Sequence, residues 1–114
     1  MSSIEITAES IVQVARQHGF TLDPGNHVTL DVDGKLCCAI GATALLIEPG
    51  MAQVSDWRAA RALVTKKLGR SALDGLEDGF EGWHGITYYI DDPESYNRYR
   101  AIGKAAAEMV EPKD

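Results

Sequence analysis

The chain has 114 residues, of which 45% are hydrophobic and 25% are charged, and its formal net charge is −6. This length is enough for a domain with its own core, so residues 1–114 are predicted to fold as a single domain. The acidic balance argues against direct binding to nucleic acid, whose phosphates are neutralised by Lys and Arg, and no apolar run approaches the ~20 residues that span a membrane.

The first predicted helix begins after Thr7, a favoured N-cap residue. Ile6 and Ile11 have the spacing of a hydrophobic staple around this cap, and Gly19 is the expected residue at which the chain leaves the helix. The turn-forming run DPGN at residues 23–26 then leads into the next element.

A β-hairpin is predicted at Asp33-Gly34, because this dipeptide accepts the positive φ angles of a two-residue type I′ turn. The turn fixes a register in which Leu30 faces Cys37. From about Cys38 the apolar spacing changes from two to three and four, which indicates that the second strand runs into a buried helix. Pro49 ends that helix.

A third helix is predicted over residues 56–68, with Ser55 as its cap and Gly69 at its end. Its inward stripe is expected to contain Trp57, Ala60, Leu63, Val64 and Leu68. A short fourth helix, capped by Ser71, is expected to stop at Gly79.

The last helix is predicted to begin at Asp92-Pro93, an N-cap acid followed by proline at the first helical position, and to run to about Val110. Its buried residues are expected to be Tyr96, Tyr99, Ile102, Gly103, Ala106, Met109 and Val110. Small residues around Gly41 and Gly103 predict that the buried helix and this last helix cross closely.

Residues 79–85, GFEGWHG, combine three glycines with aromatic and polar residues, which predicts a shaped loop. Residues 86–90, ITYYI, form either a brief third strand beside the hairpin or a loop that packs its tyrosines. Together the elements predict an α+β fold, a single small domain of four to five helices on a two- or three-stranded antiparallel sheet.

The adjacent thiols Cys37 and Cys38 are candidates for chemistry, because a cysteine at a helix start can have a lowered pKa. Cys38 with His84 or His27 as base is the catalytic hypothesis, and the alternative is that both cysteines are core residues. They lack the CxxC spacing of a zinc site, so we expect no metal and no cofactor. Adjacent cysteines do not readily bridge each other, which favours a reducing compartment.

The carboxylates Asp74, Glu77, Asp78 and Glu81 form an acidic cluster. General acid–base catalysis needs two carboxyls in distinct environments. An exposed helix edge explains the same residues without catalysis, and we favour it because no second motif accompanies them.

Aromatic residues are dense between residues 79 and 89, and aromatics dominate both interfaces and interiors. A partner surface and a cap over the core both remain open interpretations of this segment. The residues of the hypothesised partner surface are Phe80, Glu81, Trp83, His84, Tyr88 and Tyr89.

Four short motifs carry a resemblance to small uncharacterised proteins of bacteria and phages: Cys38-Ala39-Ile40-Gly41-Ala42, Leu68-Gly69, Gly79-Phe80-Glu81-Gly82, and Tyr99 before Ile102-Gly103. Those proteins carry a C-A-x-G-A run, a G-F-[DE]-G run and a C-terminal helix with a tyrosine before a glycine. The resemblance implies no activity, but it implies that the hairpin-to-helix junction and the GFEG segment pack together.

We therefore expect a small acidic interaction or regulatory protein that binds another protein through residues 79–89. The resemblance suggests that it is encoded by a phage, and the segment MSSIEITAES, which lacks the pattern of a signal peptide, predicts a cytoplasmic location. The alternative is a small cysteine-dependent enzyme using Cys38 with His84 or His27. A homodimer formed through the same aromatic segment is a third interpretation.

Overall fold

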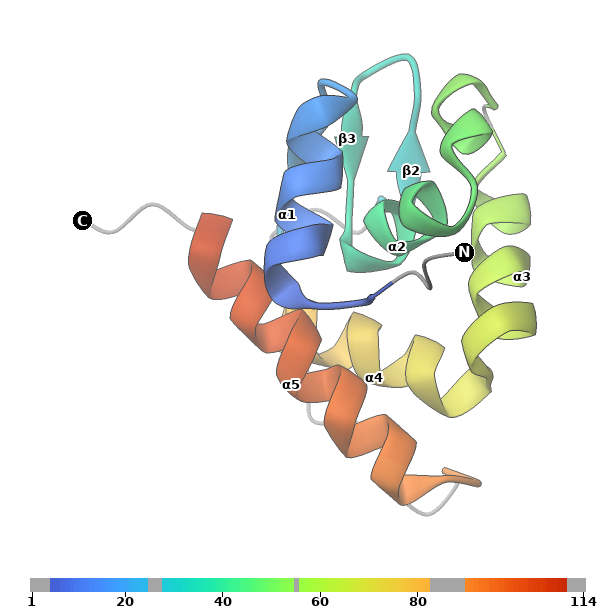
Figure 1. The fold of residues 1–114 in the computed structure, drawn as a ribbon, viewed down its shortest axis with the longest axis vertical. Coiled ribbons are helices and arrows are strands. Elements are labelled where there is room, and N and C mark those ends of the chain that lie inside the picture. The colour runs from blue at the N-terminus through green and yellow to red at the C-terminus, as the bar shows by residue number, and fades with distance from the viewer. Residues whose placement is uncertain (1–4, 25–27, 55, 83–89, 111–114) are drawn as a thin grey trace.

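The computed structural model describes residues 5–24, 28–54, 56–82 and 90–110, which form five α helices, one 3-10 helix and three short strands (Figure 1). In chain order they are α1 (Ala8–Gln17), β1 (Thr21–Leu22), β2 (Leu30–Asp31), β3 (Leu36–Cys37), α2 (Ala39–Ile47), η1 (Pro49–Gln53), α3 (Trp57–Leu68), α4 (Arg70–Glu81) and α5 (Pro93–Val110). The predicted α+β class is confirmed, and helices and sheet share one hydrophobic core.

The two ends of α1 are fixed as the sequence predicts. Thr7 Oγ1 accepts a hydrogen bond from the Ser10 N–H at 3.0 Å, and Ser10 Oγ accepts one from the Thr7 N–H at 2.9 Å. At the carboxyl end Gly19 has φ 76°, and the Phe20 N–H donates to the Ala15 carbonyl at 2.8 Å. This reversal directs the chain from α1 into the sheet.

The sheet is mixed, with the strand order β1-β3-β2: β1 is parallel to β3, and β2 is antiparallel to it. The prediction of an antiparallel sheet is therefore wrong for β1. The reversal at Gly19 lays Thr21 beside Lys35, whose carbonyl accepts the Thr21 N–H at 2.7 Å. The third strand thus comes from residues 21–22. Of the segment 86–90, the alternative source of a third strand in the sequence, residues 86–89 lie outside the described residues and Ile90 is not part of a strand.

The hairpin between β2 and β3 has the predicted register, with Leu30 opposite Cys37, but not the predicted turn. The connection covers residues 32–35, and the positive φ falls on Lys35 (57°) rather than on both Asp33 and Gly34. Asp31 Oδ1 accepts the Gly34 N–H at 3.0 Å. This local side-chain bond holds a wider turn than the two-residue type I′ loop.

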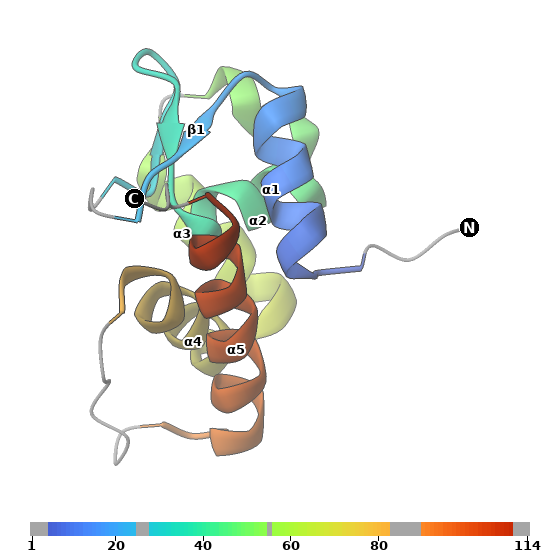
Figure 2. The same cartoon turned by 90° about the vertical axis from the view of Figure 1, so that its left-hand side faces the viewer.

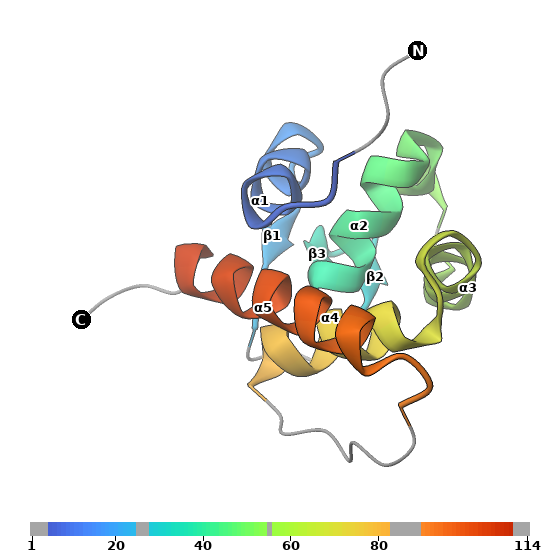
Figure 3. The same ribbon diagram turned by 60° about the horizontal axis from the view of Figure 1, so that its bottom comes forward.

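The predicted buried helix, α2, packs against α1, α3, α4 and the sheet (Figure 3). Seven consecutive residues, from Ala39 to Leu45, are buried. The buried hydroxyl of Thr43 donates to the Ala39 carbonyl at 2.7 Å, which satisfies the polar group inside the helix. The residues from Ala39 to Leu45 therefore serve mainly to fill the core.

Helices α3 and α4 differ from prediction at three of their boundaries. Asp56, not Ser55, caps α3, because its Oδ1 accepts the N–H groups of the next turn. Gly69 ends α3 as predicted and also caps α4, so Ser71 lies within α4, where its Oγ accepts the Asp92 N–H at 3.1 Å. Helix α4 continues to Glu81, so residues 79–81 form a helical turn instead of the predicted loop.

Helices α4 and α5 lie side by side and run in the same direction (Figures 1 and 2). A methyl group on Gly75 or Gly79 would overlap the backbone of α5, and one on Gly103 would lie 2.5 Å from the Leu76 carbonyl of α4. Gly41 instead approaches the Thr29 carbonyl beside β2. The predicted crossing of α2 with α5 through Gly41 and Gly103 is therefore wrong, because Gly103 faces α4.

The start of α5 is confirmed: Asp92 Oδ1 accepts the Ser95 N–H at 3.1 Å, and Pro93 is the first helical residue. Two residues predicted to face inward are exposed. The exposed fraction is 51% for Trp57 and 46% for Met109, because both lie at helix ends where the neighbouring elements do not cover them.

Candidate functional site

A groove of about 530 Å³ runs between the segment 28–33, which contains β2, and the helices α3 and α4. Trp57 and Arg61 of α3 and Glu77 of α4 line its other side. None of the four motifs or candidate sites found in the sequence predicts this groove, because it forms between segments that are distant along the chain.

One wall of the groove is the free edge of the sheet, because β2 is the outer strand of the order β1-β3-β2. The Thr29 carbonyl is directed towards β3, where it accepts the Cys38 N–H at 3.2 Å. The backbone groups of successive residues in a strand alternate in direction, so the N–H and carbonyl of Leu30 are directed away from β3. Leu30 as a whole is only 4% exposed, so its backbone groups are largely covered although they are directed away from β3.

The opposite wall is the first turn of α3. The cap formed by Asp56 fixes the position of Trp57, the first residue of the helix. The Arg58 guanidinium lies 5.1 Å from the centroid of the Trp57 ring, a distance typical of a cation–π interaction. Trp57 thus lines the groove although half of its surface is exposed.

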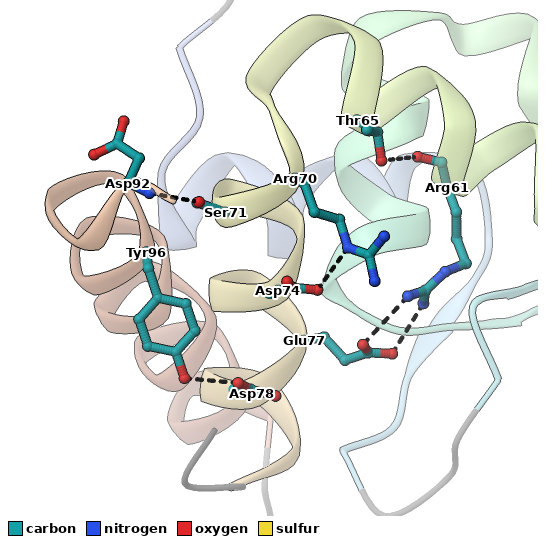
Figure 4. A network of polar contacts seen from close by, with 9 residues as sticks. All are labelled: Arg61, Thr65, Arg70, Ser71, Asp74, Glu77, Asp78, Asp92 and Tyr96. Carbon is teal, nitrogen blue, oxygen red and sulfur yellow. Dashed lines mark hydrogen bonds and ion pairs between the residues drawn. The ribbon is translucent and has the colours of Figure 1, made fainter. Parts of the chain in front are cut away.

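Arg61 and Glu77 join α3 to α4 at the groove (Figure 4). The two guanidinium nitrogens of Arg61 donate to the two carboxylate oxygens of Glu77, at 2.9 and 3.3 Å. This bidentate bond is the largest cause that raises the pKa of Arg61 above its ordinary value. Arg61 therefore stays protonated, and its guanidinium is paired with the Glu77 carboxylate.

The groove is acidic overall. Its lining contains the carboxylates of Asp31, Asp33 and Glu77 and the single guanidinium of Arg61. Among the described residues, neither Asp31 nor Asp33 has an ion-pair partner. Since Arg61 is bonded to Glu77, the two aspartates leave this face with an excess of negative charge.

The partner surface expected from the sequence is only partly within the described residues. Phe80 is 2% exposed and belongs to the core, so its assignment to a partner surface is wrong; the helical turn at residues 79–81 directs its side chain inward. Glu81 is half-buried. Trp83, His84, Tyr88 and Tyr89 lie outside the described residues.

The two thiols have the surroundings of packed core residues. Cys38 occupies the N-cap position at the start of α2, as expected, but burial raises its pKa to about 11, against the opposing effect of the Gly41 and Ile40 N–H groups. Burial, together with the neighbouring Cys38, also raises the pKa of Cys37. Both pKa values are raised, whereas a cysteine nucleophile needs a lowered pKa. The proposed bases His27 and His84 lie outside the described residues.

The acidic cluster on α4 is tied to three different partners (Figure 4). Asp74 pairs with Arg70 at 3.1 Å, Glu77 pairs with Arg61, and the Tyr96 hydroxyl donates to Asp78 Oδ2 at 2.6 Å. The bonds of Glu77 and Asp78 join α4 to α3 and α5, and the Asp74–Arg70 pair lies within α4, so each of these three carboxylates has a structural role. Within the described ranges, no three His, Cys, Asp or Glu side chains are grouped as a metal site would require.

Phe80 and Cys38 belong to the same hydrophobic core. No helix in the described part of the chain combines the length and the apolar character needed to cross a membrane. No protein-family model matches the chain, and comparisons with curated proteins and with solved structures find no match.

Proposed function

We propose that this chain is a small interaction domain that binds another protein through the groove between residues 28–33 and α3. The observation that carries this proposal is Trp57, which is 51% exposed beside the free edge of β2. Tryptophan is among the residues most enriched in the energetic centres of protein interfaces. A large indole held at the mouth of a groove is a suitable anchor for a partner side chain.

The charges and thiols of the described residues support binding over catalysis. Asp74, Glu77 and Asp78 each have a structural partner, and the thiols of Cys37 and Cys38 are buried with raised pKa values. The acidic groove is unfavourable for nucleic acid, because phosphates are repelled by carboxylates. A protein partner is compatible with both observations.

The groove replaces residues 79–89 as our leading surface, because Phe80 is buried. Glu81, Trp83, His84, Tyr88 and Tyr89 remain the rival surface predicted from the sequence. We retain the expectation that the protein acts in the cytoplasm, with a phage origin suggested by the short motifs.

A displayed library of short random peptides tests the proposal. The library is selected on the wild-type protein, and the peptides obtained are measured against Trp57→Ala and, as a matched control, Trp83→Ala. We expect Trp57→Ala to lower affinity at least tenfold, roughly 1.4 kcal/mol, and Trp83→Ala to leave it unchanged. Circular dichroism and urea unfolding establish that both variants fold.

Two results would overturn the groove as the binding surface. Peptides that bind Trp57→Ala as well as wild type would exclude the indole from the interface. Peptides lost with Trp83→Ala but retained by Trp57→Ala would return the site to the sequence-predicted surface. Sedimentation of the free protein separately tests the homodimer interpretation, which requires twice the chain mass.

A further inference from the structure

We infer that the groove binds an arginine side chain of a partner protein, with the guanidinium at Asp31 and Asp33 and the aliphatic stem against the indole of Trp57. This inference rests on the proposed function and names the chemical group that the groove recognises. Three observations on the described residues carry it: the charge of the groove, the fixed position of one carboxylate, and the apolar side chains beside the charges.

The first observation is the charge of the groove. Its lining contains three carboxylates and one guanidinium, and that guanidinium is already bonded to a carboxylate of the lining (Figure 4). The neighbours of Trp57 do not change this balance, because Asp56 and Arg58 carry opposite charges. Asp31 and Asp33 have no ion-pair partner within the described ranges, so their charges are available to a cationic group.

The second observation is that the Asp31 carboxylate is fixed in place. Its Oδ1 accepts the Gly34 N–H at 3.0 Å across the turn at residues 32–35. A carboxylate has about four lone-pair sites, so this bond leaves acceptor positions for a guanidinium, which binds carboxylates through two parallel N–H groups. An acceptor that is already ordered loses less conformational entropy when its ligand arrives.

The third observation is the apolar surface beside these charges. Val28, Val32 and Trp57 line the groove together with the aspartates. The stem of a long basic side chain covers such a surface while its charged end stays at the carboxylates. A divalent metal ion would leave the indole uncovered and needs more oxygen ligands than two aspartates supply. The lining therefore suits an organic cation with an aliphatic stem.

The same surroundings favour arginine over lysine. A guanidinium is planar, stacks on aromatic rings and matches two acceptor oxygens, whereas an ammonium is a compact and strongly hydrated charge. The indole of Trp57 already has one such neighbour, because the Arg58 guanidinium lies 5.1 Å from its ring centroid. The ring and the aspartates together thus match both parts of an arginine side chain.

The source of this arginine is a partner protein. Val54, three residues before Trp57, is 41% exposed, and a free small cation in the groove would leave this apolar side chain in water. A protein that carries the arginine can cover it with neighbouring residues. A second copy of this chain is disfavoured, because two chains with a formal net charge of −6 repel each other.

The inference is tested on the tightest library peptide that loses affinity with Trp57→Ala. The peptide should contain an arginine whose replacement by citrulline, which keeps the shape but removes the charge, lowers affinity roughly tenfold or more. Lysine at the same position should recover only part of this loss, because it restores the charge without the planar group.

A double-mutant cycle tests the role of the two aspartates. Asp31→Asn with Asp33→Asn keeps an oxygen that can accept the Gly34 N–H, so the turn is retained. In this variant the citrulline penalty should fall to about twofold, because no negative charge remains for the guanidinium to meet. Glu9→Gln with Glu108→Gln is the matched control. It removes the same charge from exposed positions outside the groove lining and should keep the full penalty.

A second measurement reads the contact with the indole. In a peptide with ¹³C-labelled arginine, the side-chain methylene protons should shift upfield on binding, because they lie over an aromatic ring. At saturating protein concentration, Trp57→Phe should keep a smaller shift in the same direction, and Trp57→Ala should remove it.

The possible outcomes separate the inference from the proposed function. A Trp57-dependent peptide that has no arginine, or that tolerates citrulline, overturns the inference and leaves the groove as a binding surface. A citrulline penalty that is unchanged in the aspartate variant overturns it too, because the guanidinium then binds elsewhere. If no selected peptide depends on Trp57, the proposed function and the inference both fail. Concentration-dependent dimers that are lost with Trp57→Ala would replace the partner protein by a second copy and so overturn the inference.

Discussion

The hydroxyl of Tyr96 on α5 donates a hydrogen bond of 2.6 Å to Oδ2 of Asp78 on α4, and this bond joins two helices that run in parallel. Tyr96 is buried, whereas Asp78 is half-buried. The bond therefore lies at the boundary between the core and the solvent, where a carboxylate keeps part of its hydration.

Tyr96→Phe should lower the free energy of unfolding by about 1 kcal/mol at neutral pH, because a charged hydrogen bond is lost and the aromatic ring is retained. The penalty should be smaller in acid, where Asp78 is protonated and no longer charged. Urea unfolding at neutral pH and near pH 3 measures both values. An equal penalty at the two pH values would contradict a bond to the ionised carboxylate.

Asp78→Asn tests the protonation of the same group. Burial is the largest cause that raises the pKa of Asp78, although the bond from Tyr96 lowers it. Because the folded-state pKa is above that of the unfolded chain, the wild type should lose stability relative to Asp78→Asn as pH rises through the interval above the ordinary value of 3.8. Unfolding of both proteins between pH 3 and pH 7 gives this difference; a difference that grows with pH in favour of wild type would refute the assignment.

Gly79→Ala should destabilise the protein by about 2 kcal/mol or more, because its methyl group would overlap the Arg100 carbonyl and separate α4 from α5. The higher helix propensity of alanine offsets only about 1 kcal/mol of this cost. Gly50→Ala is the matched control, since nothing lies within 4 Å of its added methyl group. If both variants unfold at the same urea concentration, the close approach of the two helices is wrong.

Gly69→Ala should destabilise for a different reason. The added methyl group meets no atom within 4 Å, but the backbone has φ 96° and ψ 161°, a region used almost only by glycine. We expect a loss of about 1–3 kcal/mol in the free energy of unfolding. Replacement by D-alanine through semisynthesis should restore stability, because the mirror-image residue favours positive φ, and failure to restore it would point to packing instead.

Both cysteines should react slowly with iodoacetamide in the native protein. A pKa of about 11 for Cys38 makes the thiolate fraction near pH 8 roughly 100-fold lower than for a thiol at 9.0, and burial restricts access further. Reaction in urea, where both thiols are exposed, is the reference rate. Labelling of native Cys38 faster than a free thiol would instead support the cysteine-dependent enzyme.

Local signals predicted much of the fold. Four features depend on a few adjacent residues, so the sequence is enough to locate them. They are the cap at Thr7, the reversal at Gly19, the register of Leu30 with Cys37 and the start of α5. The turn at residues 32–35 was mispredicted because a side chain, Asp31, competes with the backbone preference of Asp-Gly.

Errors concentrated where distant segments meet. Residues 79–81 continue a helix because Gly79 is needed for contact with α5, and a sequence pattern interprets that glycine as a helix end. The groove was missed for the same reason, since it depends on α3 lying opposite the β2 edge. The sequence feature that could have indicated the groove was Trp57 in the first turn of a capped helix. Side chains in the first turn of a helix are often less covered by neighbouring elements than those in its middle.

Gly69 also connects the two helices that line the groove. It is the single residue between α3 and α4, and Arg61 and Glu77 each lie eight positions from it, one on either helix. The ion pair therefore lies about 12 Å along each helix from Gly69. The bidentate contact between Arg61 and Glu77, at 2.9 Å, joins α3 to α4 at this distance from their connection. If this ion pair were lost, only the connection at Gly69 and the packing of Ala60 and Val64 in the core would set the separation of α3 from α4 beside β2.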